Sequence, residues 1–378
     1  LLHCTGPPRE VAVGPASMAK SQTVKAREGD VLDQDFITPG RFRELDGFRG
    51  LAAITVVIYH LGVPATENYP RTAPSPYDIA LGELGVQLFF IISGFVILLS
   101  AIKSGSALKF AISRFSRIYP TYWFALAVSA LVYFIYGNPG RHITIPQTLI
   151  NTTMLQRFLR VDNVDQVYWT LAVELQFYVM VALYLIIRKG KIYRGELTTI
   201  LLTWSVIGTA LCLLFHPEAS LGGAPKMIVW AAVAEHSSLF SLGMMFFMYS
   251  HDRKFTWHIP YFAILASLNA ALMHDLAHGI GVALISLVFF IVVYLKNVPV
   301  LSRGPLNFLG RISYPLYLGH AMVGYMLVDM FYPVAGPWGA RIIALVLVIC
   351  FAYLVHISIE TKVSASFRSF LTRKLTKA

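Results

Sequence analysis

The chain of 378 residues has few charged side chains and few cysteines. Charged residues make up 13% of the sequence, which is about half the share found in soluble domains. Hydrophobic residues reach 56%, and the mean hydropathy is +0.62. This shortage of charge excludes intrinsic disorder, a charged nucleic-acid scaffold and a typical cytosolic enzyme. Cys4, Cys212 and Cys350 form no CxxC pair, so neither a disulfide framework nor a thiolate metal site is indicated.

The N-terminal segment has no long hydrophobic run. Residues 1–40 are polar with scattered proline and glycine, which excludes a cleaved secretory signal there. The sequence opens with Leu1, and we expect the true start to be Met18. We interpret residues 1–40 as a polar cytoplasmic tail, residues 41–362 as one membrane domain and residues 363–378 as a basic cytoplasmic tail.

Apolar segments near the 20-residue spanning length recur along the rest of the chain. The predicted fold is therefore an all-α, polytopic membrane helix bundle of about ten transmembrane helices. The expected spans are 45–63, 84–102, 118–136, 168–187, 197–215, 227–249, 258–274, 277–295, 312–330 and 340–359.

The basic residues give this bundle an expected orientation. With both termini in the cytoplasm, 25 of the 31 Lys and Arg residues fall on the inner side of the spans. That asymmetry follows the positive-inside rule, and we expect a multi-pass protein of a bacterial cytoplasmic (inner) membrane. Because topology accounts for most of the net charge of +11, no nucleic-acid partner is needed.

Ionisable side chains at membrane depth are costly and therefore mark candidate sites. Arg49 and His60 are both in the first span, within about 20° of one helix face and roughly 16 Å apart along its axis. In the ninth span, Ser313, Tyr317 and His320 form one polar stripe. The two histidines are expected at a similar depth.

Two carboxylates are also expected inside the bundle, Glu174 in the fourth span and Glu235 in the sixth. Histidine is the usual general base near neutral pH, and a carboxylate orients it or stabilises its charged form. An arrangement of His60 with Glu174 or Glu235 would suit base catalysis on a hydroxyl group. A structural alternative stays open for the buried His and Glu residues, because these side chains can simply pair with each other within a helix bundle. Gly94 likewise suits close packing between helices.

Five segments, in the right order along most of the chain, resemble the acyltransferase 3 family of integral-membrane acyltransferases. Arg49 and His60 match the Arg-x10-His signature of that family. The similar segments read ELDGFRGLAA from residue 44, GVQLFFIISGF from 85, RFSRIYP from 114, YWTLAVELQFY from 168 and ISYPLYLGH from 312. The chain departs from the family pattern at Gln87, Thr170 and Gly319, where aspartate, serine and tryptophan are more usual.

The resemblance implies transfer of an acyl group, commonly acetyl, from cytosolic acyl-CoA to a hydroxyl group of a surface or exported carbohydrate. No metal is expected, and no SGNH-type esterase domain follows the tenth span, which indicates a stand-alone form. The expected catalytic residues are His60, as general base, with Arg49 and Glu174. Those expected at the donor are Arg114, Arg117 and Ser93, and the candidate supporting residues are Gln176, His320, Tyr317 and Glu235.

Three alternatives stay open at this point. In the first, His60 or Ser93 carries the acyl group covalently before the acceptor receives it. In the second, the chain is a multi-pass transporter or flippase whose buried His and Glu residues form a proton relay. In the third, it is a non-catalytic assembly protein for surface polysaccharide. Turnover of acyl-CoA separates an enzyme from the last two.

Overall fold

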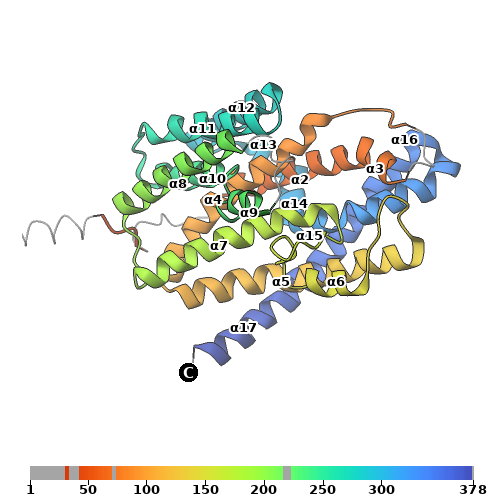
Figure 1. Cartoon of the computed structure of the whole chain (residues 1–378), viewed down its shortest axis with the longest axis horizontal. Coiled ribbons are helices and arrows are strands. Elements are labelled where there is room, and N and C mark those ends of the chain that lie inside the picture. Colours follow the sequence, from red (N-terminus) through yellow and green to blue (C-terminus); the bar gives the residue numbers. More distant parts are fainter. Residues whose placement is uncertain (1–29, 34–41, 70–73, 216–222, 377–378) are drawn as a thin grey trace, which may run out of the picture.

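The computed structural model describes residues 30–33, 42–69, 74–215 and 223–376, and over these ranges the chain is helical with no β-strand. Most helices lie roughly along the long axis of the molecule (Figure 1). The first half contains α2 (Glu44–Leu61), α3 (Val63–Asn68), η2 (Ala80–Leu84), α4 (Gly85–Ser104), α5 (Ala107–Tyr136), α6 (Ile145–Asn151), η3 (Gln166–Tyr168) and α7 (Trp169–Ile187). The second half contains α8 (Arg194–Leu214), α9 (Gly223–Ala231), α10 (Ser237–Asp252), α11 (His258–Met273), α12 (Leu276–Leu295), α13 (Pro299–Ser302), α14 (Gly304–Arg311), α15 (Ser313–Gly319), α16 (Met322–Val355), η5 (His356–Val363) and α17 (Ser364–Leu375).

Several helices are long and apolar enough to cross a bilayer, which confirms the predicted class of multi-pass α-helical membrane protein. Six segments of the described chain meet this condition: Ala80–Ser104, Ala107–Tyr136, Gln166–Ile187, Arg194–Leu214, Leu276–Leu295 and Met322–Leu375. The number ten and the cytoplasmic placement of both termini stay predictions. Met18 and most of the N-terminal tail lie outside the described residues.

The helix carrying the predicted donor-binding arginines is longer than its apolar segment. The predicted span began near residue 118, whereas α5 begins at Ala107 and runs for 30 residues. Gly105 ends α4 in the left-handed conformation, with φ of 56°, and the chain re-enters a helix two residues later. Arg114 and Arg117 therefore project from one face of a continuous helix rather than from a loop.

Two of the other predicted spans are interrupted in the structure. The sixth is divided into α9 and α10 by a turn at residues 232–236, where Val233 has φ of 51°. The ninth is divided at residues 320–321 into α15 and the first part of α16, and a kink of α16 at Gly336, with φ of 67°, separates it from the tenth. Pro333 and Pro337 flank that kink, and each removes a backbone hydrogen bond that would keep the helix straight.

Glycines allow the central helices to approach one another closely. A Cβ atom on Gly94 of α4 would lie 2.1 Å from the carbonyl oxygen of Phe240 in α10. A Cβ atom on Gly243 of α10 would lie 2.0 Å from the carbonyl oxygen of Ile91 in α4. The structure thus gives Gly94 a packing role, because only glycine permits this backbone contact between membrane helices.

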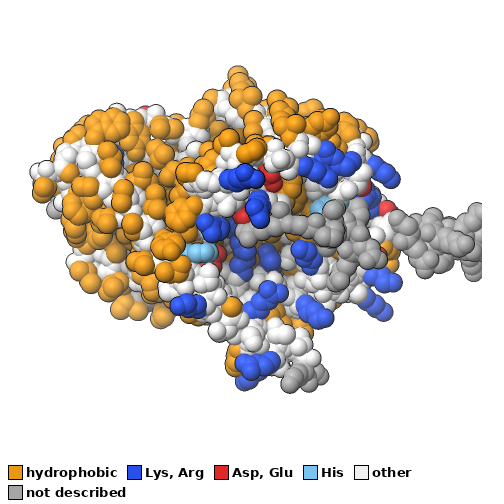
Figure 2. Space-filling model, turned by 180° about the vertical axis from the view of Figure 1, so that it is seen from behind, with side chains coloured by type: hydrophobic (Ala, Val, Ile, Leu, Met, Phe, Trp, Pro, Cys, Tyr) orange, Lys and Arg blue, Asp and Glu red, His pale blue; other side chains and the backbone are white. Residues whose placement is uncertain are grey.

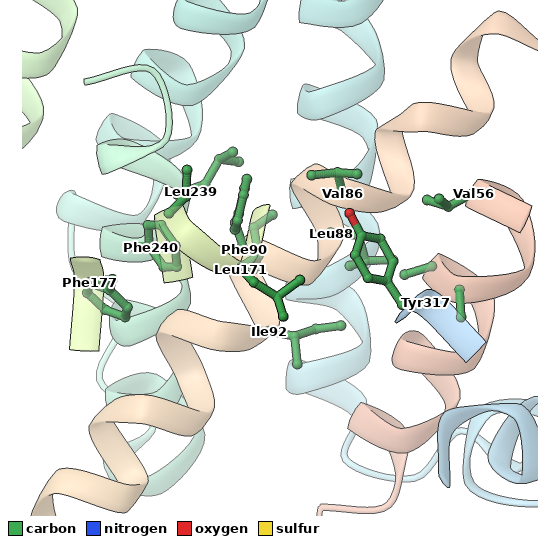
Figure 3. Close-up of a cluster of buried hydrophobic side chains, with 14 of the residues drawn as sticks. Val56, Val86, Leu88, Phe90, Ile92, Leu171, Phe177, Leu239, Phe240 and Tyr317 are labelled. Atoms are coloured by element: carbon green, nitrogen blue, oxygen red, sulfur yellow. The ribbon is translucent and has the colours of Figure 1, made fainter. Parts of the chain in front are cut away.

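Aromatic side chains fill the space beside this crossing (Figure 3). The ring centroids of Phe177 and Phe240 are 4.1 Å apart, and Phe90 lies 5.0 Å from Phe240. Figure 3 shows Tyr317 on the opposite side of α4 from this group, near Val86. The core therefore packs α4 from both sides and fixes the position of the residues that it carries.

The surface separates apolar from basic regions. Figure 2 shows hydrophobic side chains over one half of the molecule and Lys and Arg side chains gathered over the other. Apolar residues such as Val334 and Ile135 are 89% and 77% exposed, which suits contact with lipid tails rather than water. This division agrees with a bundle whose basic end faces one side of a membrane.

Candidate active site

A cavity of about 110 Å³ lies between α2, α4, α5, α7 and α15. These elements come from both ends of the membrane domain, and each contributes a segment that the sequence analysis singled out. The polar side chains that line it are Arg49, Ser93, Arg114, Arg117, Thr170, Glu174, Tyr178, Ser313, Tyr314 and Tyr317. Hydrophobic side chains of α4, such as Phe89 and Ile92, complete the wall. The structure therefore brings six of the predicted site residues to one cavity.

Arginine side chains dominate the charge of this cavity. Arg49 comes from α2, while Arg114 and Arg117 are one turn apart on α5. The Arg114 guanidinium lies 6.0 Å from the ring centroid of Tyr178, and its Nε has no hydrogen-bond partner within the described chain. Against three guanidinium groups the wall offers one carboxylate, that of Glu174. The excess of positive charge in a partly desolvated space favours an anionic ligand.

A serine and a carboxylate are hydrogen-bonded to each other in the same cavity. Ser93 Oγ donates to Glu174 Oε1 at 2.7 Å, and the Tyr178 hydroxyl donates to the same oxygen at 2.6 Å. Glu174 and Tyr178 are one turn apart on α7, so the helix itself sets their spacing. Two hydroxyl donors keep the carboxylate in one orientation while leaving it in a position to accept a proton from Ser93.

His60 and His320 are in direct contact beyond the cavity wall. His320 Nε2 lies 3.2 Å from His60 Nδ1, and the two rings meet edge to face with centroids 4.8 Å apart. His320 is fully buried, and its Nδ1 lies 2.7 Å from the carbonyl oxygen of Tyr317. His60 Nδ1 lies 2.9 Å from the carbonyl oxygen of Val56. The two histidines, which were expected at a similar depth, thus form a pair.

The hydrogen-bond partners of this pair assign its tautomers. A carbonyl oxygen only accepts, so Nδ1 carries the hydrogen in both neutral rings. His320 Nε2 then has a lone pair that accepts from His60 Nδ1. His60 Nε2 is left with its lone pair, and no described residue donates to it. This is the state that a general base requires.

Tyr317 connects the cavity with the histidine pair. It lines the cavity, and its ring centroid lies 5.5 Å from that of His320. Its hydroxyl group lies 2.8 Å from Thr170 Oγ1 and 3.1 Å from the carbonyl oxygen of Val167. His60 and His320 therefore lie one side chain away from the space that contains the arginines.

Two predicted supporting residues lie elsewhere. Glu235 is in the turn between α9 and α10, with Oε1 3.0 Å from His274 Nε2, so it does not pair with His60. The expected depth of Glu235 assumed a continuous helix, and the break at 232–236 moves it. Gln176 does not line the cavity, and both its amide atoms are buried without a partner in the described chain. Glu174 likewise contacts Ser93 and Tyr178 rather than His60.

Two tyrosines of the cavity were not singled out from the sequence. Tyr178 binds Glu174, and Tyr314 donates its hydroxyl hydrogen to the carbonyl oxygen of Ile118 at 2.8 Å. Both stand inside the segments from 168 and 312 that carried the family resemblance. Tyr178 is one helical turn after Glu174, and Tyr314 directly follows Ser313. This closeness to predicted site residues was the signal that could have identified both tyrosines from the sequence.

These features define an integral-membrane protein with a positively charged cavity beside a buried pair of histidines. Residues 42–357 match the family model described as an acyltransferase domain, so the chain belongs to this acyltransferase family. As a member of it, the chain is an acyltransferase.

One curated relative is similar over most of the chain and another over half of it. Nodulation protein 10 of Rhizobium leguminosarum bv. viciae is 26% identical over 373 residues, which cover 90% of this chain and 98% of that protein. Acyltransferase MdmB of Streptomyces mycarofaciens is 26% identical over 201 residues, which cover 50% of each chain. No solved structure matches this chain significantly.

Proposed function

We propose that this acyltransferase takes a short acyl group, with acetyl as the best fit, from cytosolic acyl-CoA and transfers it to a hydroxyl group of a carbohydrate on the outer side of the membrane. The observation that carries the proposal is the cavity in which Arg49, Arg114 and Arg117 surround a single carboxylate. A CoA donor has several phosphate charges, and guanidinium groups bind phosphate through paired, charge-assisted hydrogen bonds.

The size of the cavity supports a short acyl group. One buried water needs roughly 10–15 Å³ of such space, so a volume of about 110 Å³ has room for a group of several heavy atoms. An acetyl group fits such a space, whereas a long fatty-acyl chain requires a much longer one. Ile92, Leu171 and Tyr317, which are all buried, form part of its wall.

A second, more open groove supports a carbohydrate acceptor. It has a volume of about 540 Å³ and is lined by Arg157, Arg160, Val161, Asp162, Asn163, Trp169, Lys226 and Trp230. Amide, carboxylate and guanidinium groups beside two indole rings offer both hydrogen bonds and flat apolar faces, which suit a sugar ring. Trp169 precedes Thr170, which lines the cavity and contacts Tyr317. The groove and the cavity are therefore lined by adjacent residues at the start of α7.

In the proposed reaction, His60 Nε2 accepts the hydroxyl proton of the acceptor while the hydroxyl oxygen attacks the thioester carbonyl carbon. A C–O bond forms and the C–S bond breaks. The CoA thiolate leaves and takes up the proton from His60, which restores the neutral base. His320 holds the His60 ring through its Nδ1, and Arg49 and Glu174 position the donor. Tyr317 stands where donor and acceptor meet.

An acyl-enzyme route is the mechanistic rival, and Ser93 is its best-placed nucleophile because its hydroxyl group is hydrogen-bonded to Glu174. In that route Glu174 takes the Ser93 proton, and the acyl group moves to Ser93 Oγ before it reaches the acceptor. Incubation with radiolabelled acetyl-CoA in the absence of acceptor separates the two routes. Direct transfer predicts no stable label on the protein, and a label that Ser93→Ala removes supports the serine route.

The donor assignment is tested with the purified chain in vesicles that contain acetyl-CoA on the side of the basic residues. We expect release of free CoA that increases when a mixture of cell-surface glycans is added on the other side, together with labelled acetyl esters on the glycans. Movement of glycan across vesicles that lack acyl-CoA, without CoA release, would instead support the transporter alternative.

The groove gives a prediction about acceptor recognition. Trp230 lies under two cations, with Arg157 at 4.3 Å and Lys226 at 4.9 Å from its ring. Trp230→Ala removes the flat face and leaves both cations in place, so we expect the KM for the glycan to rise about tenfold, the effect of losing about 1.4 kcal/mol of binding. The KM for acetyl-CoA should not change. Trp257→Ala, on an exposed tryptophan away from the groove, is the matched control.

A further inference from the structure

Two histidines and a glutamate from three separate elements converge at the turn between α11 and α12. Glu83 belongs to η2, His274 follows the last residue of α11, and His278 lies in the first turn of α12. One side-chain ligand atom from each lies within 4.8 Å of the others. None of the three lines the cavity or the groove described above. The group is therefore separate from the acyl-transfer site.

The surroundings of His278 resemble those of a metal ligand. Its Nδ1 lies 2.8 Å from Asp275 Oδ1, and its Nε2 lies 2.6 Å from Glu83 Oε1. A neutral imidazole has one N–H, so these two contacts fit either a charged imidazolium that donates to both carboxylates or a ring with a metal ion on one nitrogen. Histidines that bind metals commonly donate one ring N–H to a carboxylate while the other nitrogen binds the ion. Asp275 is itself held in place, because its Oδ1 also accepts from the backbone N–H of His278 at 2.9 Å.

His274 is oriented by a second carboxylate. Glu235 Oε1 lies 3.0 Å from His274 Nε2, and the ring of His274 stacks on that of His278 with centroids 5.0 Å apart. The extended conformation of Asp275 turns the chain between α11 and α12, and the two imidazoles meet across this turn. Each histidine of the group thus has a carboxylate that fixes its ring, which is the support that a metal site requires.

We propose that Glu83, His274 and His278 bind a divalent transition-metal ion, with Zn²⁺ as the ion that best matches two imidazoles and one carboxylate. Ligand atoms around tetrahedral Zn²⁺ are separated by about 3.3 Å. The Glu83–His278 contact of 2.6 Å therefore widens slightly as the ion replaces the hydrogen between the two atoms. His274 moves inward to complete the set, and water fills the fourth position.

This ion would tie the start of α4 to the α11–α12 turn. η2 leads directly into α4, which carries Ser93. η2 also lies against α2, since a Cβ atom on Gly82 would be 2.8 Å from Cβ of Tyr59 and 2.9 Å from the carbonyl oxygen of Thr55. A metal bridge at Glu83 would hold this segment on the residue that precedes His60. Its role would be structural, and it adds no step to acyl transfer.

The test is metal analysis of the full-length protein in detergent. The protein is stripped with a chelator, incubated with ZnCl₂, desalted and measured by atomic spectrometry. We expect about one Zn²⁺ per chain for the wild type and for His258→Ala, a histidine at the opposite end of α11. His274→Ala and His278→Ala should retain none. Substitution of Co²⁺ for Zn²⁺ should give the visible absorption of a tetrahedral site only in the first two proteins.

A milder variant keeps the test informative where an alanine variant does not fold. Asp275→Asn leaves all three ligands in place and removes only the supporting carboxylate. We expect its Zn²⁺ affinity to fall about 10- to 100-fold. Zn²⁺ should also raise the thermal unfolding midpoint of the wild type and not that of Glu83→Gln. Stoichiometry in the wild type no higher than in His278→Ala, or a midpoint that Zn²⁺ leaves unchanged, would overturn the proposal.

Discussion

The His60→Ala variant is expected to lose acyl transfer almost completely, with a rate about 10²- to 10⁴-fold below that of the wild type, which is the usual contribution of a general base. The physical reason is that His60 Nε2 has the free lone pair of the His60–His320 pair, and the His320 Nε2 that remains is fully buried and lies behind the position that the His60 ring vacates. The measurement is acetyl ester formation on the glycan at saturating acetyl-CoA.

The control for this variant is His258→Ala, which removes a histidine at the start of α11, away from the cavity. We expect His258→Ala to transfer acetyl groups at the wild-type rate. His60→Ala should still reach the membrane and bind acetyl-CoA, because His60 does not line the donor cavity. Near-normal transfer by His60→Ala would contradict the assignment of His60 as the general base. It would instead support the acyl-enzyme route, in which Glu174 takes the proton of Ser93.

The Arg117→Ala variant should raise the KM for acetyl-CoA about 10- to 150-fold, since a hydrogen bond between charged groups contributes about 1.5–3 kcal/mol. The KM for the glycan should stay near the wild-type value, because Arg117 lines the cavity and not the outer groove. Steady-state kinetics with each substrate varied in turn separates the two constants. Arg117→Lys should recover only part of the loss, since lysine lacks the planar pair of donors.

Arg303→Ala serves as the matched control, because Arg303 is exposed before α14 and does not line the cavity. It removes the same charge from the protein, so a general effect of net charge on CoA binding would appear in both variants. An equal rise of KM in Arg303→Ala, or an unchanged KM in Arg117→Ala, would contradict a donor site at the cavity arginines.

The main features of the fold were predictable because hydrophobicity along the chain directly reports lipid-facing helices. The boundaries of α7 and α12 agree with the predicted spans to within a residue or two. The break between α9 and α10 was not predictable, since it depends on the backbone conformation at Val233 rather than on composition. The early start of α5 was hidden because its first turns alternate apolar with basic and hydroxyl residues, which lowers their hydropathy below that of a membrane span.

Part of the candidate site was also accessible from the sequence. The matching motifs selected Arg49, Ser93, Arg114, Arg117 and Glu174, which the fold places around one cavity. Helix geometry placed His60 and His320 at a similar depth but could not show that the rings touch. Contact between residues 260 positions apart depends on how α2 and α15 pack, and spacing within a single helix carries no information about that.

The crossing of α4 and α10 has a consequence for how this enzyme can diversify. Gly94 follows Ser93 directly, and its backbone lies against that of Phe240, so the donor side of the site is built on a frame that tolerates almost no displacement. The groove proposed for the acceptor, in contrast, is formed mainly by the connecting segment before α7 and by the short helix α9. If the acceptor binds there, its identity could change through a few surface substitutions without any change in the packed helices that carry the donor residues.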